Sequence, residues 1–438
     1  MSRRNSRRNF IKSTALAGAG FWVASSTPLA RSRSINERIN FACIGVGGKG
    51  TSDSNSAAKH GNVVAICDID EQRLAGAAKR FPNAKKFVDF RDMLVGMDEE
   101  IDAVTVSTPD HTHAPASIMA MKMGKHCFCQ KPLTHSLHEA RQMADVARQT
   151  GVKTQMGNQG TASPRLREAA EIVQSGAIGT VHEAHVWTNR PVWPQGKARP
   201  TPQRVPAHVH WDLFLGTAPY RPYAPGYHPF AWRGWWDFGT GALGDMACHT
   251  MNMPFMALGL HSPVSVEAES SGHDQDSYPA NSRIRYEFPA TDQRPAVTMI
   301  WYDGGQKPPE DLFLGEARPN TGSLLVGDAG RLLSPNDYGA TANILLPRPK
   351  FKGYKPPSPS IARSPGHFTE FARAINGGPA AMSNFPDYSG PLTETVLLGN
   401  LAVWAAKKVE WDAKNLKATN APEVASIIKR EYREGYAL

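Results

Sequence analysis

Cysteine is scarce in this sequence, and no hydrophobic run is long enough to cross a membrane. Only five of the 438 residues are cysteines, an odd number, which disfavours a disulfide framework and favours small buried side chains. Cys127 and Cys129 form a close pair, but no second pair completes a zinc site. The apolar stretch at residues 13–26 is shorter than the roughly 18–20 residues of a transmembrane helix. We therefore expect no stable membrane insertion.

Acidic residues are absent before Glu37, whereas seven arginines and lysines lie within residues 1–33. Subtracting these seven positive charges from the net charge of +9 leaves +2 for the remainder of the chain. No later stretch interleaves aromatic residues with a dense stripe of lysine and arginine. We therefore expect no nucleic-acid partner.

The basic leader has the order of an export signal. Arg7 and Arg8, followed by Phe10, Lys12 and the apolar stretch, resemble the twin-arginine signal, which exports folded proteins. We expect residues 1–35 to be a signal peptide and linker, the twin-arginine export machinery to be a partner, and the protein to be periplasmic. A disordered basic leader without a targeting role is the alternative.

The chain is long enough for two domains, and residues 36–158 have the pattern of the first. Five short apolar runs alternate there with helical periods, as in βαβ units around a parallel sheet. This predicts an α/β, doubly wound Rossmann domain. The apolar runs are INFACIGVG, NVVAICDID, DAVTVSTPD, KHCFCQKP and VKTQMGN.

Residues 159–438 have a different pattern. Strand-like runs follow one another without intervening helices, which predicts an α+β domain with an antiparallel sheet that is covered on one face. The exposed face favours a homo-oligomer. A Pro- and Trp-rich insertion at residues 190–236 interrupts the strands. Helical patterns return at residues 368–376, 393–408 and 423–435.

A glycine-rich turn follows the first strand of the Rossmann domain. Gly45, Gly47 and Gly50 have G-x-G-x-x-G spacing, with Gly48 between them, and Asp68 ends the second strand. Such glycines let a pyrophosphate approach the backbone at a helix N-terminus, and the acid binds the adenosine ribose. The sequence therefore predicts a dinucleotide site. A structural glycine turn without a phosphate is the alternative.

The choice of cofactor depends on the charge beside the ribose. The Asp68 carboxylate would repel a 2′-phosphate, so we expect NAD rather than NADP. Arg73 lies five residues on and is expected on the solvated face of its helix.

Two further groups of residues carry candidate chemistry. Lys131 follows the fourth strand, at the edge where open α/β sheets bind ligands, and is suited to hydrogen-bond a reacting hydroxyl. Asp245 and His249 are four residues apart and share a face if helical, and an imidazole can accept an alcohol proton. A surface lysine and an inert Asp–His pair are the alternatives. We expect no metal site from the H-x-H pairs His111, His113, His208 and His210.

Together these motifs resemble the Gfo/Idh/MocA oxidoreductases, the family of glucose–fructose oxidoreductase and inositol dehydrogenase. The resemblance extends from about residue 38 onward and rests on GVGGKG, AICDID, STPDHTHA, GKHCFCQKPLTH and GALGDMACH. It implies a Rossmann domain followed by an open, mostly antiparallel sheet that supports substrate binding and often oligomer contacts. It also implies catalytic roles for Lys131, Asp245 and His249.

The resemblance extends to the residues around the nicotinamide. The family's turn near the nicotinamide ribose falls on Pro109, Asp110 and His113, and its E-K-P motif includes Lys131. One departure is that Gln130 replaces the commonest glutamate before the lysine. Glutamine can form a hydrogen bond but carries no charge.

The family's substrates are sugars, polyols and their glycosides. Sugar C–H faces stack on aromatic rings, so the aromatic residues of the insertion and its flanks are tentative substrate residues. Buried packing is a comparable explanation for each of them. The candidates are Trp193, Tyr227, Trp235 and Trp236.

The resemblance and the leader together predict an exported NAD(P)-dependent sugar or polyol dehydrogenase. Because an exported enzyme has no free NAD pool to draw on, the cofactor should be tightly bound and recycled on the protein. One alternative is a redox-neutral glycosidase in which oxidation and re-reduction bracket the bond cleavage. Another is a silent sugar-binding module.

Overall fold

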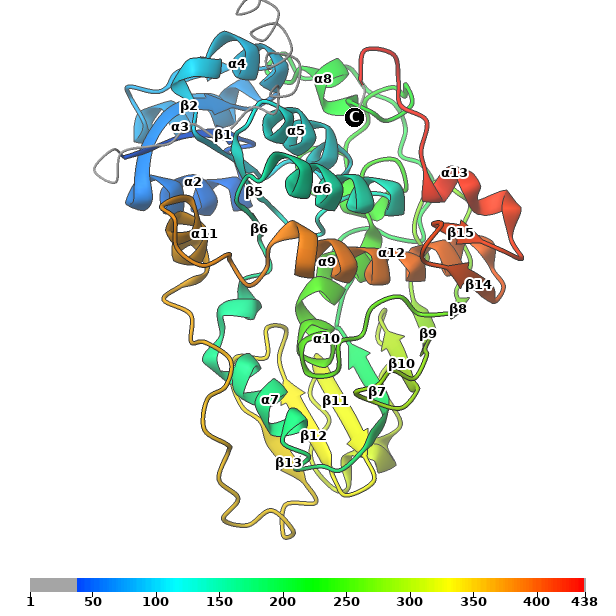
Figure 1. The fold of residues 1–438 in the computed structure, drawn as a ribbon. Coiled ribbons are helices and arrows are strands. Elements are labelled where there is room, and N and C mark those ends of the chain that lie inside the picture. The colour runs from blue at the N-terminus through cyan, green and yellow to red at the C-terminus, as the bar shows by residue number, and fades with distance from the viewer. Residues whose placement is uncertain (1–37, 437–438) are drawn as a thin grey trace, which may run out of the picture.

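The computed structural model describes residues 38–436, so the expected export signal lies outside the described residues. A Rossmann half and a half built on a large second sheet stack end to end (Figure 1). None of the helices in the described part of the chain is long and apolar enough to span a membrane. All five cysteines are buried as free thiols.

The Rossmann half contains a six-stranded sheet in which every pair of neighbours is parallel. The strand order reverses beside the first strand, as in doubly wound folds, which confirms the predicted fold class. From edge to edge the strands are β3 (Lys85–Phe87), β2 (Gly61–Cys67), β1 (Ile39–Ile44), β4 (Ala103–Val106), β5 (His126–Cys129) and β6 (Thr154–Met156).

Helices connect these strands, and local capping fixes where they begin. Asp70 caps one helix by accepting hydrogen bonds from the backbone N–H groups of Gln72 and Arg73. Ser136 and Glu139 form a capping box at another, which satisfies N–H groups that the helix leaves unpaired. The helices are α2 (Lys49–His60), α3 (Glu71–Arg80), α4 (Phe90–Gly96), α5 (Asp110–Lys122) and α6 (Leu137–Thr150).

The second half contains a nine-stranded sheet that is antiparallel except for one parallel pair, β10 with β7. This confirms the expected mostly antiparallel sheet. In order across the sheet the strands are β13 (Ile344–Leu346), β12 (Arg331–Pro335), β11 (Gly322–Gly327), β7 (Val181–Trp187), β10 (Val297–Tyr302), β9 (Ser282–Phe288), β8 (Ser265–Ser270), β14 (Val409–Asp412) and β15 (Lys417–Ala418).

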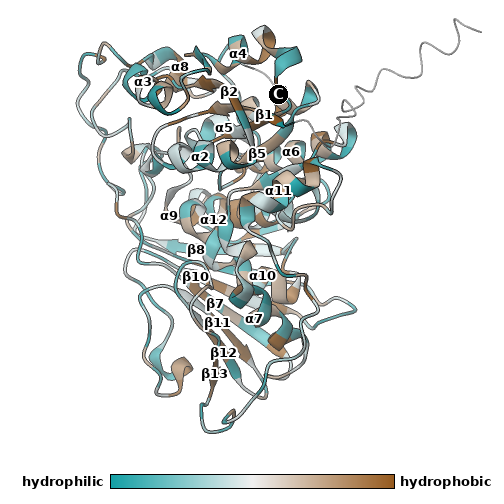
Figure 2. Ribbon diagram, turned by 90° about the vertical axis from the view of Figure 1, so that its left-hand side faces the viewer, coloured by the Kyte–Doolittle hydropathy of each residue, from teal (hydrophilic) through white to brown (hydrophobic). Residues whose placement is uncertain are grey.

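One face of this sheet carries helices (Figure 2). In β9, Ile284 and Tyr286 are buried in the same core as residues of the helices, whereas Arg283 and Arg285 on the opposite face are exposed. This alternation is typical of an antiparallel sheet with one covered face. The helices are α7 (Pro164–Gln174), α9 (Gly241–Thr250), α10 (Asn252–Leu258) and α12 (Gly390–Ala405).

The two halves share one apolar core. The largest buried cluster joins Ile44 and Val104 of the Rossmann sheet to Tyr286 of β9 and Leu397 of α12. Helix α11 (His367–Ile375) also returns to the Rossmann half, where Phe371 packs in the cluster that contains β1. Late residues of the chain therefore help to build the first half.

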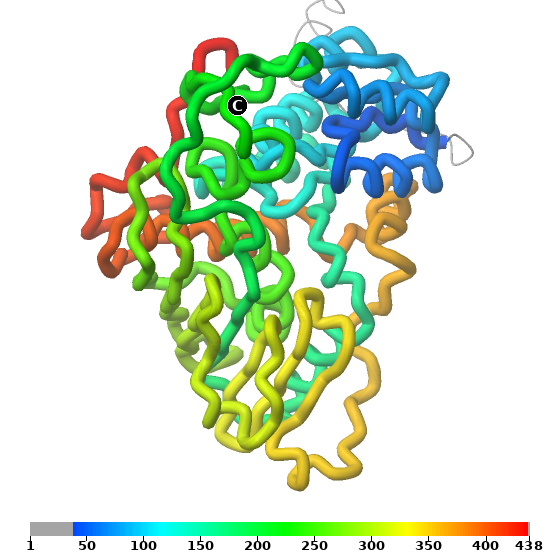
Figure 3. The backbone as a smooth tube through the Cα atoms, turned by 180° about the vertical axis from the view of Figure 1, so that it is seen from behind, coloured from blue at the N-terminus to red at the C-terminus, as the bar shows by residue number. Residues whose placement is uncertain are grey.

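The Pro- and Trp-rich insertion docks on the Rossmann half (Figure 3). It contains the short helix α8 (Trp211–Leu215), and Val209 forms an isolated antiparallel bridge with Asp70. The backbone N–H of His210 donates to the Ile69 carbonyl oxygen at 2.9 Å. The insertion therefore lies across the carboxyl edge of the parallel sheet, where ligands of this fold bind.

Candidate functional site

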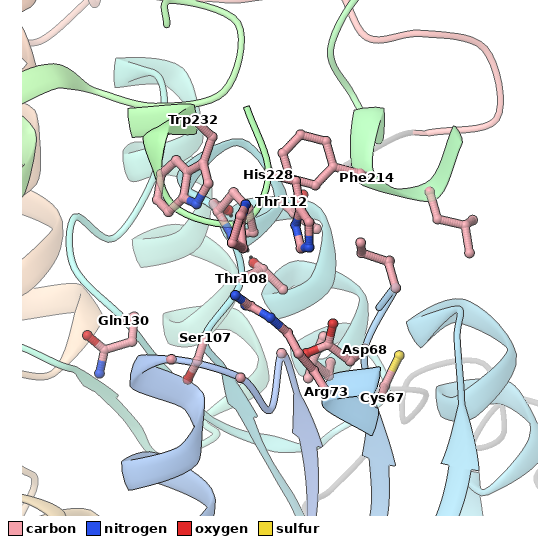
Figure 4. A pocket seen from close by; sticks show the side chains of 18 of the residues that line it. Cys67, Asp68, Arg73, Ser107, Thr108, Thr112, Gln130, Phe214, His228 and Trp232 are labelled. Atoms are coloured by element: carbon pink, nitrogen blue, oxygen red, sulfur yellow. Dashed lines mark hydrogen bonds between the residues drawn. The ribbon is translucent and has the colours of Figure 1, made fainter. Parts of the chain in front are cut away.

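A cavity lies between the carboxyl edge of the Rossmann sheet and the insertion. Its floor comes from the glycine-rich turn and the strand ends, and its roof from residues 213–214 and 228–233. Figure 4 shows Asp68 and Arg73 on one side and Gln130 on the other, with Phe214 and Trp232 above them. The cavity thus runs from the dinucleotide fingerprint to the Lys131 turn.

The glycine-rich turn requires glycine for steric reasons. A Cβ atom at Gly50 would lie 1.9 Å from the Gly45 carbonyl oxygen, so the start of α2 packs directly on the turn. Gly45 has φ 77°, and a Cβ there would lie 2.6 Å from the Ser107 oxygen. Gly48 has open space on its Cβ side and lines the cavity. A backbone cradle at a helix N-terminus fits a pyrophosphate.

Asp68 lines the cavity directly after β2. One carboxylate oxygen accepts the Val46 N–H at 2.9 Å and the other the Asp70 N–H at 3.0 Å. Burial raises the pKa of Asp68, and these two hydrogen bonds lower it in part. The carboxylate therefore fixes the turn and also lines the cavity.

Arg73 differs from its expected position on the solvated helix face. It lines the cavity, and a Cβ at Gly47 would lie 2.5 Å from its Cδ. The reason is that Asp70, which caps α3, also attracts the guanidinium of Arg73. The Arg73 Nε lies 3.7 Å from Asp70 Oδ2. A carboxylate and a guanidinium thus both border this end of the cavity.

Lys131 is held by a charged network at the far side of the cavity. Its Nζ lies 2.6 Å from Asp245 Oδ1 and also donates to the Asp245 carbonyl oxygen at 3.0 Å. Arg233 lies 3.2 Å from Asp245 and 3.2 Å from Asp110, and Thr240 donates to Asp110 at 2.6 Å. Two cations and two carboxylates therefore balance one another.

This network governs the ionisation of Asp245. Burial alone would raise the pKa of its carboxyl, but the positive charges of Lys131 and Arg233 hold the pKa well below its usual range. Asp245 therefore stays ionised and keeps the Lys131 ammonium directed to one place.

His249 lies one turn after Asp245 on α9 and is 3% exposed. Burial and the nearby Lys131 lower its pKa well below the usual value, so the imidazole is neutral. Its Nδ1 is buried and has no hydrogen-bond partner in the described part of the chain. The ring of Tyr338 packs edge-on against it, with centroids 4.7 Å apart. The structure thus brings Asp245 against Lys131, with a neutral base in the next turn.

Gln130, which replaces the family's glutamate, donates a hydrogen bond to a buried carboxylate. Its Nε2 lies 2.9 Å from Asp53 Oδ2, which also accepts from Ser107 at 2.8 Å. Lys49 pairs with the other oxygen of Asp53. The charge absent at position 130 is therefore present on α2, directly opposite.

The remaining predicted cofactor residues divide into two groups. Pro109 and Asp110 line the cavity. His113 is buried, with its ring nitrogens 2.8 Å from the Pro132 oxygen and 2.9 Å from the Thr108 oxygen. His113 therefore joins the turn before α5 to the turn after Lys131 and is not among the cavity's lining residues.

The four tentative substrate residues lie within the packing of the insertion and its surroundings. Each is at most 5% exposed, and none lines the cavity, so their contact with a substrate stays a prediction. The cavity instead has aromatic walls from Phe214, Phe230 and Trp232. The residues concerned are Trp193, Tyr227, Trp235 and Trp236.

Sequence reasoning missed Arg233, Tyr338 and Trp232. Arg233 and Trp232 lie in a Trp-rich stretch in which no periodic pattern distinguishes side chains that line the cavity from side chains that are packed in the core. Tyr338 follows β12 in a turn. The paired histidines His208 and His210 lie near Asp70 and Glu71 at the docking edge. Among residues 38–436 no group of three or more His, Cys, Asp or Glu side chains is arranged to hold a metal.

Both halves of the chain match models of one protein family. Residues 39–158 match the GFO/IDH/MocA oxidoreductase family, NAD-binding Rossmann fold, and residues 165–313 match its C-terminal alpha/beta domain. Inositol 2-dehydrogenase of Rubrobacter xylanophilus is 32% identical over 151 residues, which are 34% of this chain and 43% of that protein. The chain thus aligns with less than half the length of such curated relatives.

Solved structures share the fold over nearly their whole length. The WlbA dehydrogenase of Bordetella pertussis, in complex with NADH and UDP-GlcNAcA, has a TM-score of 0.61 at 15% identity and covers 86% of this chain and 99% of its own. An aldose–aldose oxidoreductase of Caulobacter crescentus, complexed with glycerol, has a TM-score of 0.59 at 15% identity and covers 86% and 100%.

Proposed function

Because this chain belongs to the Gfo/Idh/MocA family of oxidoreductases, we propose that it transfers a hydride between a nicotinamide cofactor and a hydroxyl-bearing carbon of a sugar, polyol or glycoside. The single observation that carries the proposal is the Lys131–Asp245 pair, 2.6 Å apart at the end of the cofactor cavity. His249 lies one turn beyond it.

The residues of the cavity fit a dinucleotide. Gly45, Gly47 and Gly48 would hold the pyrophosphate at the start of α2, and Asp68 would hold the adenosine ribose, which favours NAD. A bound nicotinamide would supply the hydride acceptor for the alcohol carbon. Asp110 and Lys131 border that end of the cavity.

Side chains of the protein would accept and return the hydroxyl proton. The Lys131 ammonium, anchored by Asp245, donates a hydrogen bond to the reacting hydroxyl oxygen and fixes its position. His249 is neutral because of burial, so its ring can accept the hydroxyl proton while hydrogen leaves the same carbon with its electron pair. In the reverse direction the imidazolium returns the proton.

The charge balance favours a neutral substrate. Lys131 and Arg233 are already paired with Asp245 and Asp110, so neither of these two cations is left without a counter-charge that an acidic sugar could supply. The aromatic walls suit the C–H face of a sugar ring. We therefore propose an uncharged polyhydroxylated substrate.

The cofactor test starts with purified protein. Denaturation should release a dinucleotide, which chromatography would identify as NAD or NADP. A panel of neutral sugars and polyols should then reduce the cofactor on the enzyme, followed by the absorbance of the reduced nicotinamide. Absence of any bound or bindable dinucleotide would contradict the proposal.

A nitrophenyl glycoside distinguishes the alternatives. Release of nitrophenol without an added acceptor would indicate redox-neutral glycoside cleavage. Binding of sugar without reduction of the cofactor or cleavage would indicate a silent binding module.

We also propose export through the twin-arginine pathway to the periplasm, on the strength of Arg7 and Arg8 before an apolar stretch. A cofactor loaded before export would then have to remain bound. Replacing both arginines with lysine should retain the protein in the cytoplasm, as measured by fractionation. Equal export of the variant would contradict this.

The exposed face of the large sheet supports self-association, which sedimentation would test.

A further inference from the structure

The last described residues leave their own half and end on the cofactor cavity. Residues 429–436, here named the C-terminal strap, follow the short helix α13 (Ala425–Ile428). Figure 1 shows the strap in red, rising from α13 to lie beside α8. Tyr436 lines the cavity, and nothing in the sequence patterns indicates this position.

We propose that the C-terminal strap forms the outer wall of the adenine end of the cofactor site, with Tyr436 as a cofactor-binding residue. The inference rests on the proposed function, because it assigns this wall to a bound dinucleotide.

Polar contacts hold the strap along its length. Arg430 donates to the Trp236 carbonyl oxygen at 2.7 Å and contacts His135 at 2.9 Å. Tyr432 donates to Glu139 of α6. Arg433 donates to the Gly216 carbonyl oxygen at 3.1 Å. The strap is therefore attached to both the insertion and the Rossmann half.

Arg433 is also attached to α8 and to the end of the strap. Its guanidinium pairs with Asp212 and donates to the Asp212 carbonyl oxygen at 2.7 Å. The same group lies 5.6 Å from the centroid of the Tyr436 ring. Loss of Arg433 would therefore loosen the strap without removing a side chain from the cavity.

The Rossmann half fixes the Tyr436 ring from the other side. The guanidinium of Arg91 lies 4.5 Å from the ring centroid, and its Nη1 donates to the Gly435 oxygen at 3.1 Å. Arg91 is itself paired with Asp89 at 2.6 Å. Cation–π contact and hydrogen bonding thus hold the ring at the cavity wall.

The neighbours of Tyr436 identify which end of the cavity it closes. Asp68, Val88 and Phe90 line the same cavity and follow the ends of β2 and β3. In a Rossmann fold the acid after the second strand marks the adenosine side. Gln130, next to Lys131, lies at the opposite side from Asp68 (Figure 4). A flat adenine ring fits between apolar and aromatic side chains.

This placement has a kinetic consequence. A dinucleotide seated beneath the strap can leave only after Tyr436 moves, which requires contacts with Arg91 and Arg433 to break. Movement of the strap alone would slow entry and exit alike, so it is the contact of Tyr436 with the bound adenine that would slow dissociation more than association.

The test compares dissociation of NADH from variants of the full chain. Bound NADH is chased with excess NAD, and its fluorescence is followed by stopped flow. Tyr436→Ala should accelerate dissociation about tenfold, since it removes an aromatic contact, and Tyr436→Phe should behave as wild type. Arg433→Ala should also accelerate it. Tyr220→Ala is the matched control, because Tyr220 is 75% exposed on the insertion.

The outcomes separate the two proposals. NADH binding by wild type with equal dissociation from Tyr436→Ala would overturn the role of the strap and leave the proposed function intact. Failure of wild type to bind NADH would overturn both. Circular dichroism of each variant shows whether it is folded. If Tyr436→Ala is not folded, Arg433→Ala carries the test, and dissociation from it at the wild-type rate would overturn the role of the strap.

Discussion

His249 combines a neutral imidazole with a position outside the cofactor cavity. Replacement with asparagine should therefore lower kcat by about 10²–10⁴, the usual contribution of a general base, and leave NADH affinity unchanged. Steady-state kinetics and fluorescence titration measure the two quantities. His261→Asn, at an exposed histidine, is the control. A variant with normal kcat would remove His249 from the mechanism.

The buried pair of Gln130 and Asp53 offers a second residue-scale test. Gln130→Glu would place a carboxylate where an amide now donates to Asp53 at 2.9 Å. We expect a loss of about 1–3 kcal/mol in the free energy of unfolding, because a buried donor is replaced by a like charge. Urea unfolding measures it.

A compensating change is the control for this pair. The double variant Gln130→Glu, Asp53→Asn restores one donor and one acceptor, so most of the lost stability should return. Additive losses in the double variant would contradict the pairing.

Single residues were predictable where a motif tied them to a strand end or to one face of a helix. Lys131 and Asp245 carry such motifs, and the structure places them in contact. Arg233 was not predictable, because its two carboxylate partners lie on other elements, Asp110 on α5 and Asp245 on α9, and no motif relates them to it. Tyr436 likewise gains its position only from contacts across the whole chain.

Among the elements, helix α2 depends on its glycines. Gly50→Ala should abolish NADH binding, since its Cβ would lie 1.9 Å from the Gly45 oxygen and force the turn away from the helix start. Gly76→Ala is the matched control, because this position within α3 has open space and alanine favours a helix by about 1 kcal/mol. Calorimetric titration with NADH measures both. Normal binding by Gly50→Ala would contradict the cradle.

Elements were predictable from sequence where burial was continuous. Five of the six strands of the Rossmann sheet are apolar runs, whereas β3 was missed because its residues are exposed or half-buried at one edge of the sheet. The helix expected at residues 423–435 is present only in its first part, because α13 ends at Ile428. Arg430, Tyr432 and Arg433 there bond to distant partners, so tertiary contacts override helix propensity.

At the scale of the whole molecule, the chain crosses between its halves more often than a two-domain sequence pattern indicates. The insertion, α11 and the C-terminal strap all return to the Rossmann half. The pattern of strands predicted the two sheets, because alternation and burial are local properties. How the cavity is closed was not predictable. The insertion and the C-terminal strap, which close it, have no regular pattern of apolar residues.

The free energy of unfolding of the whole molecule should depend on pH through Asp303, a buried carboxyl at the end of β10. It accepts hydrogen bonds from the Ser282 N–H at 2.6 Å, the Ser282 hydroxyl at 2.7 Å and the Trp301 indole at 2.8 Å. Burial raises its pKa from 3.8 to about 6 despite these bonds. The folded chain therefore keeps a proton that the unfolded chain has already released.

The sign of the effect follows from this difference. The contribution of Asp303 to stability is fully present below the unfolded pKa and is lost as pH rises through about 6, a change of about 3 kcal/mol. Asp303→Asn cannot titrate, although it disturbs one of the three donors. The free energy of unfolding of wild type should therefore fall relative to that of the variant by this amount between acidic and neutral pH. Urea unfolding at a series of pH values measures the difference. A constant difference would show that the pKa of Asp303 is the same in the folded and the unfolded chain, so that its three donors offset the effect of burial.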